Sequence, residues 1–140
     1  MTPKAASAQS RKATTLFKDA KAFSSFSVKD VQKAKEFYGQ ILGIKVAEMQ
    51  EGLDLNLAGG SHVFLYPKPN HTPASFTVLN FPVDDIEEAV SELNSLGISL
   101  EKYNQPDLKT DARGIMRSDD MQIAWFKDPS GNILSVIEEK

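Results

Sequence analysis

The side chains that most often carry chemistry are few in this chain of 140 residues. Cysteine is absent and histidine occurs only twice, as His62 and His71, so thiolate chemistry and a histidine-rich metal cluster are both excluded. Carboxylates stand in adjacent pairs such as Asp84-Asp85 and Asp119-Asp120. Neighbouring side chains point apart, which favours helix caps and turns over a cooperating acid and base. The sequence has no glycine-rich phosphate loop and no nucleophile elbow, so function must come from how the fold groups scattered residues.

The elements that must position these residues come from an internal repeat. Residues 26–34 and 81–89 share a pattern of apolar residues and aspartate at a spacing of 55, and residues 42–44 and 96–98 are both Leu-Gly-Ile. Self-similarity of this kind indicates a duplicated supersecondary unit. In each copy an aspartate, Asp30 or Asp85, offers a helix cap, and apolar residues recur at helical spacing until the glycine. The chain therefore consists of two copies of one module.

Strand, helix and turn signals extend each module to a βαβββ order. Module one covers about residues 21–67, a proline-rich linker covers 67–73, and module two covers about 75–140. We expect an α+β fold in which one helix covers one face of each curved four-stranded sheet, while the other faces enclose a cleft for a small ligand. The expected elements are strands at 22–28, 44–49, 53–57 and 61–66 with a helix at 31–42, then strands at 75–83, 98–103, 121–126 and 132–137 with a helix at 85–96, and a short strand near 115–116 in the polar loop 104–120.

Charge and hydropathy limit the partners that such a fold can take. The net charge is −3, but residues 1–20 contain four Lys or Arg and one Asp, so they carry +3 and residues 21–140 carry −6. An acidic body argues against nucleic acid, and no apolar run reaches the roughly 18 residues that a membrane span needs. We expect residues 1–20 to be a flexible basic N-terminal extension, or an arm on a partner subunit, and 21–140 to be a single domain. The lack of cysteine fits a cytoplasmic location.

The motifs inside the repeat also resemble a known family. The pattern of residues 28–31, Phe37-Tyr38 and residues 42–44, followed by the turn at residues 128–132, is similar to the vicinal oxygen chelate superfamily, which includes glyoxalase I, bleomycin-resistance proteins and extradiol dioxygenases. The resemblance covers about residues 23–138. It implies a glyoxalase/bleomycin-resistance-like fold, in which tandem βαβββ modules form a curved, cup-like mixed sheet. It further implies a homodimer, as in many members of this size, and, in the enzymes, a divalent metal held inside the cup.

The resemblance assigns four metal-ligand positions, and in this chain none of them is a good ligand. The first lies seven residues before the helix-starting aspartate, which gives Phe23 in module one and Val78 in module two. The other two, glutamates in the family, fall near Leu65 and at Ser135. Divalent transition metals need imidazole, carboxylate or thiolate donors, so we expect neither a metal nor another cofactor.

Without a metal, the residues at these positions predict an apolar cavity with few polar groups. Residues at period two on the same strands would share the lining, as would the penultimate strand. Such a cavity suits a small hydrophobic or aromatic molecule oriented by one or two hydrogen bonds. We therefore predict a metal-independent binding protein, homodimeric by the resemblance, with no catalytic residue assigned. The predicted ligand-binding residues are Phe23, Ser25, Leu65, Val78, Asn80, Trp125 and Ser135, with Ser27, Val63, Phe76 and Ile133 on the same lining.

Two alternatives remain open. One is a metal-dependent lyase- or dioxygenase-like enzyme whose ligands have moved, for example to His62 or to carboxylates of the loop 104–120. Against it, His62 is three residues from Leu65 and is therefore expected on the opposite face of its strand. The other alternative is a dimeric interaction module whose cup is filled by its own side chains, because Phe23 and Leu65 are large enough to close it.

Overall fold

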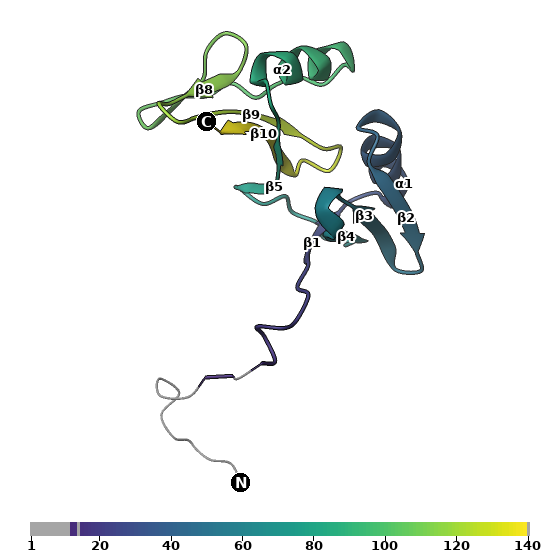
Figure 1. The fold of residues 1–140 in the computed structure, drawn as a ribbon. Coiled ribbons are helices and arrows are strands. Elements are labelled where there is room, and N and C mark those ends of the chain that lie inside the picture. The colour runs from purple at the N-terminus through teal and green to yellow at the C-terminus, as the bar shows by residue number, and fades with distance from the viewer. Residues whose placement is uncertain (1–11, 14, 140) are drawn as a thin grey trace.

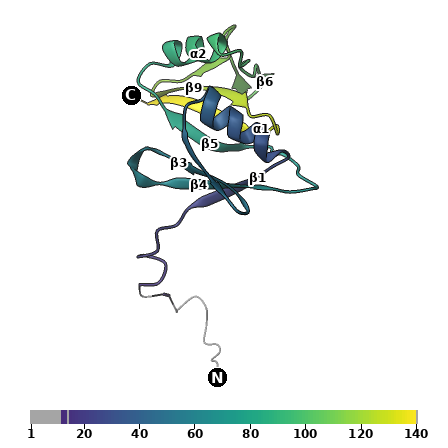
Figure 2. The same ribbon diagram turned by 90° about the vertical axis from the view of Figure 1, so that its right-hand side faces the viewer.

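The computed structural model describes residues 12–13 and 15–139 and contains the two expected modules, each with a four-stranded sheet and a helix (Figure 1). The described residues before β1 lead away from the body, with Leu16 and Phe17 exposed (Figures 1 and 2). The remainder of the expected basic extension, residues 1–11 and 14, lies outside the described residues. The predicted α+β arrangement of tandem βαβββ modules is confirmed.

Module one forms a sheet in the strand order β1-β4-β3-β2, with β1 parallel to β4 and the other pairs antiparallel. At the start of its helix, Asp30 accepts a hydrogen bond from the N–H of Lys33 at 3.1 Å, as its predicted cap requires. Gly43 follows the helix with a φ of 76°, a conformation that glycine adopts without strain. The elements are β1 (Ser24–Val28), α1 (Val31–Lys35) continued by the π-helical η2 (Glu36–Ile41), β2 (Lys45–Met49), β3 (Gly52–Asn56), the 3₁₀ turn η3 (Ala58–Gly60) and β4 (His62–Pro67).

Module two repeats this arrangement in the strand order β5-β10-β9-β8, with β5 parallel to β10. Asp85 caps its helix by accepting hydrogen bonds from the N–H groups of Glu87 and Glu88 at 3.0 and 3.2 Å. A small hairpin of β6 and β7 lies outside the main sheet. The elements are β5 (Thr77–Pro82), α2 (Ile86–Ser95), β6 (Asn104–Gln105), β7 (Leu108–Lys109), β8 (Ile115–Arg117), β9 (Met121–Lys127) and β10 (Ile133–Glu139).

The strand expected at 98–103 is replaced by β8, which was expected only as a minor strand. In segment 98–103 the N–H of Glu101 donates to the carbonyl of Trp125 at 2.8 Å, but the chain then turns into the β6–β7 hairpin. β8 instead pairs with β9, and Ile115 opposite Ala124 becomes fully buried. Burial of this apolar side chain, which stabilises by about 1.5–3 kcal/mol, favours the later segment at the sheet edge.

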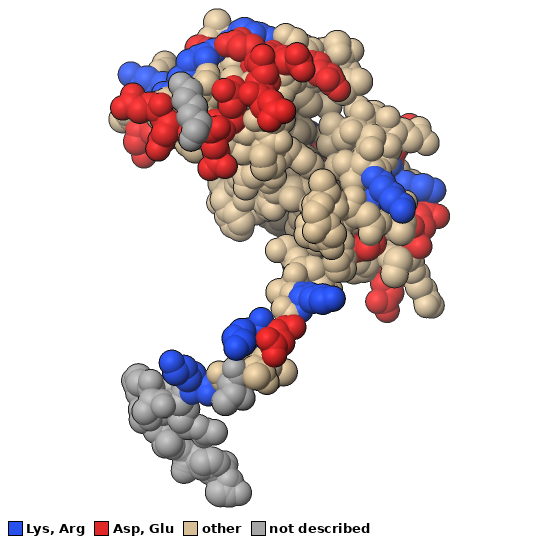
Figure 3. All heavy atoms as spheres, in the orientation of Figure 1, with Lys and Arg blue, Asp and Glu red and all other residues tan. Residues whose placement is uncertain are grey.

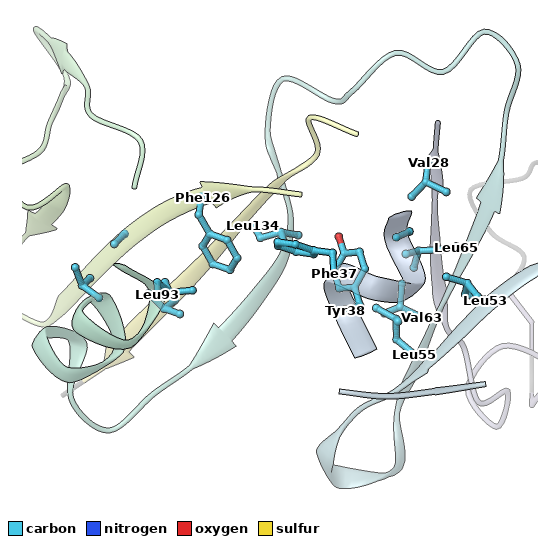
Figure 4. Packing of buried hydrophobic residues seen from close by; sticks show 14 of the residues in the cluster. Val28, Phe37, Tyr38, Leu53, Leu55, Val63, Leu65, Leu93, Phe126 and Leu134 are labelled. Carbon is cyan, nitrogen blue, oxygen red and sulfur yellow. The ribbon is translucent and has the colours of Figure 1, made fainter. Parts of the chain in front are cut away.

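One hydrophobic core joins the two modules on the helix side of both sheets. Phe37 and Tyr38 of η2 are buried, and Figure 4 shows Phe37 beside Leu134 of β10 and near Phe126 of β9. In Figure 2, α1 lies in front of the strands of module two, and the strands of module one lie below it. The helix of module one therefore packs on its own sheet and also against module two. The opposite face of each sheet, which we call the helix-free face, is left for other contacts.

Candidate functional site

The pairing of β1 with β4 defines the helix-free face of module one. Phe26 pairs with Leu65, and both contribute to the core. The alternate pairs, Ser25 with Phe64 and Ser27 with Tyr66, must point to the other side because side chains alternate along a strand. Phe23, which precedes β1 at the same parity, has 57% of its surface exposed.

Leu65 does not lie on this face, and the expectation that it lines the cup is corrected. Its side chain is fully buried in the core opposite Leu53, and Val63 is buried on the same side. A shift of one residue along a strand reverses every side chain. The expectation that His62 faces away from the cup was therefore wrong for the same reason, since His62 alternates with Val63.

His62 lies next to the first expected ligand position. Its imidazole stacks on Phe23 with ring centroids 4.6 Å apart, and its Nδ1 is 2.6 Å from Oδ1 of Asp54 on β3. Both side chains are partly exposed. The sequence named His62 only as a possible moved metal ligand and predicted neither its place on this face nor its hydrogen bond to Asp54. The alternation of Leu53 and Leu55 with Asp54 was the signal that could have set the facing of β4 correctly.

Module two brings three of the predicted residues together on its own helix-free face. Ser135 of β10 is fully buried and pairs with Asn80 of β5 and Trp125 of β9. The Ser135 hydroxyl is hydrogen-bonded to Oδ1 of Asn80. The Trp125 indole N–H donates to Oγ1 of Thr77 at 3.0 Å, and the ring of Tyr103 packs edge-on at 5.5 Å. Thr77 and Tyr103 were not predicted.

Val78 packs against the core instead of standing beside Ser135. The register of β5 against β10 shifts between Ile133 and Leu134, whose partners are Thr77 and Leu79, so Val78 is left between them as a bulge. It is half-buried against the core cluster. A bulge changes which side a residue faces, so counting from the repeat could not locate this position.

With the fold and these positions established, comparison with known proteins decides the family. The family model described as Glyoxalase/Bleomycin resistance protein/Dioxygenase superfamily matches residues 23–136. The chain belongs to this superfamily. A comparison with curated proteins gave no match.

Several solved structures share the fold of this chain. TnmS3, an antibiotic binding protein from Streptomyces sp. CB03234, is 23% identical with a TM-score of 0.59, over 85% of this chain and 96% of its own. A glyoxalase/dioxygenase from Nostoc punctiforme is 15% identical with a TM-score of 0.65, over 93% and 98%. The fosfomycin resistance protein FosX from Listeria monocytogenes is 12% identical with a TM-score of 0.62, over 85% and 92%.

The donor set of this superfamily member does not fit a divalent metal. Phe23 has no lone pair to offer, and the Ser135 hydroxyl is buried and bonded to Asn80. His62 and Asp54 supply two donors, whereas protein metal sites usually take three or four. Within residues 12–13 and 15–139, no cluster of three or more His, Asp or Glu is placed to hold an ion.

The loop 104–120, a second place where moved ligands were considered, is occupied by ion pairs with α2. Arg113 and Arg117 both contact the Glu87 carboxylate, and Arg117 also contacts Asp111 at 3.3 Å. Burial alone would raise the pKa of Asp111, but hydrogen bonds from the N–H groups of Ile115 and Arg113 and the charge of Arg117 hold it below its usual 3.8. These carboxylates therefore serve to fix the loop. Figure 3 shows charged side chains gathered over module two, while the part of the surface around β5 that faces the viewer is uncharged.

The linker histidine joins the modules at the end of β1. Nδ1 of His71 is 2.6 Å from Oγ of Ser27, and its Nε2 is 2.9 Å from the carbonyl oxygen of Ser130. The Asn132 amide donates to the Ser27 carbonyl at 2.9 Å. The predicted turn at residues 128–132 thus docks on β1.

Among the described residues, no helix is both long and apolar enough to cross a bilayer.

An apolar groove of about 260 Å³ lies on the helix side, away from all of these groups. Glu92 is the charged residue in its wall, and the remainder is apolar. The groove marks where η2, α2 and the module-two sheet meet, so it follows from the packing of the modules. Its lining residues are Leu42, Ile44, Phe81, Val83, Ala89, Glu92, Leu93, Leu96, Phe126 and Val136.

Proposed function

We propose that this superfamily member binds a small hydrophobic or aromatic molecule on the helix-free faces, without a metal and as a homodimer in the cytoplasm. The observation that carries the proposal is the aromatic character of these faces. Phe64 and Tyr66 lie nearly parallel, with centroids 6.4 Å apart, and Phe23 and Trp125 belong to the same faces. Aromatic surfaces bind flat apolar ligands through dispersion and stacking.

A few polar groups beside the aromatic rings would orient the ligand. Asn80 is exposed, and because its oxygen is bonded to Ser135, its amide N–H groups remain to donate. His62 offers a ring nitrogen on the other module. The antibiotic binding protein TnmS3 shares the fold and supports a binding role, although the resemblance is in fold alone.

A homodimer would cover the apolar part of the face. Phe23 is 57% exposed on the same face as Phe64 and Tyr66, and Phe76, which precedes β5, is 66% exposed. Exposed apolar patches mark interaction surfaces. A second copy that packs its helix-free face against the first would convert two open sheets into an enclosed cup.

Calorimetric titration with 2-naphthol, with and without EDTA, tests the binding proposal. We expect saturable binding that EDTA leaves unchanged and that Phe64→Ala weakens about tenfold, equivalent to about 1.4 kcal/mol. Phe17→Ala is the matched control, because Phe17 is exposed on the segment before β1. Equal affinity of the Phe64 variant and the control would refute the assignment of the site.

The second candidate is a metal-dependent lyase- or dioxygenase-like enzyme. The position of His62 beside Phe23, bonded to Asp54, favours it. Elemental analysis separates the two candidates. The enzyme requires one divalent ion per chain that is lost in His62→Ala, whereas the binding protein requires none.

A further inference from the structure

The contact between Ser27 and His71 has a defined direction. The Ser130 oxygen that faces Nε2 of His71 is a carbonyl, which can only accept a hydrogen bond, so Nε2 carries the proton. In the neutral imidazole, Nδ1 then holds the lone pair. The Ser27 hydroxyl, 2.6 Å away, therefore donates to Nδ1.

This is the arrangement that activates a serine. A nucleophile lies within hydrogen-bond reach of a base, and a third group holds the base in the required tautomer. Here the carbonyl of Ser130 takes the place of the usual carboxylate.

The orienting carbonyl is itself held in place. The Ser130 N–H donates to Oδ1 of Asp128 at 2.8 Å, and the Ser130 hydroxyl accepts from the N–H of Lys29 at 2.8 Å. The carbonyl that fixes the tautomer of His71 therefore belongs to a residue that is itself held by two hydrogen bonds.

The serine is also placed where a ligand can reach it. Ser27 pairs with Tyr66 and lies on the helix-free face, and both Ser27 and His71 are partly exposed. We propose that Ser27 is a nucleophile, that His71 is its general base, and that the pair accepts acyl groups from small carboxylic esters. The proposal stands on this geometry and does not depend on the ligand-binding role argued above.

In the proposed step, Oγ of Ser27 bonds to the ester carbonyl carbon while its proton passes to Nδ1 of His71. The carbonyl π electrons move to the oxygen and return as the bond to the leaving alkoxide breaks. Nδ1 then gives its proton to that alkoxide. The resulting alcohol leaves, and Ser27 remains acylated. Water then attacks the acyl carbon and gives a proton to the same nitrogen. The bond from the acyl carbon to Oγ breaks, the carboxylic acid leaves, and Nδ1 returns the proton to Oγ of Ser27.

Labelling of the whole protein with a biotinylated fluorophosphonate tests the nucleophile. Attack forms a P–O bond, breaks the P–F bond and sends the serine proton to His71. We expect mass spectrometry to find the adduct on Ser27, formed about 100-fold faster than on Ser25, which is on the same strand face without a histidine. Equal labelling of the two serines in the wild-type chain would overturn the proposal without any variant.

His71→Gln separates a catalytic pair from a structural tie. A glutamine can donate to the Ser130 carbonyl and accept from the Ser27 hydroxyl, but it cannot take up the proton. We expect an unchanged melting temperature with about a 100-fold loss of labelling and of p-nitrophenyl acetate cleavage. Ser24→Ala, a matched change on the same strand, should retain both. Labelling of the His71 variant at the wild-type rate would mean that the contact only ties the linker to β1.

Discussion

The hydroxyl of Tyr38 donates a 2.7 Å hydrogen bond to the carboxylate of Asp128, although 90 residues separate the two in the chain. Tyr38 is fully buried and Asp128 is 5% exposed. The same carboxylate accepts hydrogen bonds from the N–H groups of Ser130 and Asn132 at 2.8 and 2.9 Å. The bond thus ties the helix of module one to the β9–β10 turn of module two.

Removing this hydroxyl should destabilise the whole domain. We expect Tyr38→Phe to lower the free energy of unfolding by about 1.5–3 kcal/mol, the range for a hydrogen bond to a charged group. The ring and its packing are retained, so the loss reports the bond alone. Urea unfolding at pH 7 measures it. The matched control is Tyr66→Phe, on the helix-free face, for which less than about 0.5 kcal/mol is expected.

The same contact predicts a loss of stability in alkali. Burial, followed by the charge of Asp128 and the hydrogen bond to it, raises the pKa of Tyr38 far above its ordinary 10.0. Above about pH 10 the unfolded tyrosine ionises while the folded one keeps its proton, so stability falls as pH rises, with a limiting slope of about 1.4 kcal/mol per pH unit. Tyrosine ionises between about pH 9 and 11. Over this range, urea unfolding should show that the free energy of unfolding falls less steeply in Tyr38→Phe than in the wild type. Identical slopes would argue against this origin.

The sequence predicted what depends on local pattern. The caps at Asp30 and Asp85 and the turn at residues 128–132 each follow from a few neighbouring residues, and the structure contains all three. It did not predict the facing of Leu65, because that position was counted from the family pattern, and an error of one residue along a strand reverses the face.

Positions that depend on contacts between residues far apart in the chain could not be predicted either. The bulge at Val78 arises where β5 pairs with β10, which is far away in the chain, and the Tyr38–Asp128 bond forms only when the modules dock. The Ser27–His71 bond forms only when the linker folds back on β1. Of the predicted ligand-binding residues, Ser135, Asn80 and Trp125 meet on one sheet, whereas Thr77 and the place of His62 on the helix-free face came only from the structure. Whether these residues bind a ligand stays a prediction.

Acid should weaken the hydrogen bonds that Asp111 accepts within the loop 104–120. The pKa of Asp111 is depressed, so the stabilisation that its carboxylate gives is present above its unfolded value of 3.8 and is lost as pH falls through the lower folded value. We expect the protection factor of the Ile115 amide, which donates to Asp111 at 2.9 Å, to fall below about pH 4. Hydrogen exchange measures it, and the Thr110 amide, bonded to the Tyr103 carbonyl, is the control. In Asp111→Asn the pH dependence at Ile115 should disappear.

A change at Phe23 should dissociate the proposed homodimer. This ring is 57% exposed and covers His62 on the helix-free face, so in a dimer it would be buried against the second copy. A carboxylate at this position would have to be desolvated on association, which costs several kcal/mol when it is unpaired. We expect sedimentation equilibrium to find a dimer for the wild type and a monomer for Phe23→Asp. Phe17→Asp, a matched change at a ring that is 75% exposed outside the sheets, should remain dimeric. A monomeric wild type would remove the homodimer, and a dimeric Phe23→Asp would place the interface on another surface, because the introduced charge would then remain in water.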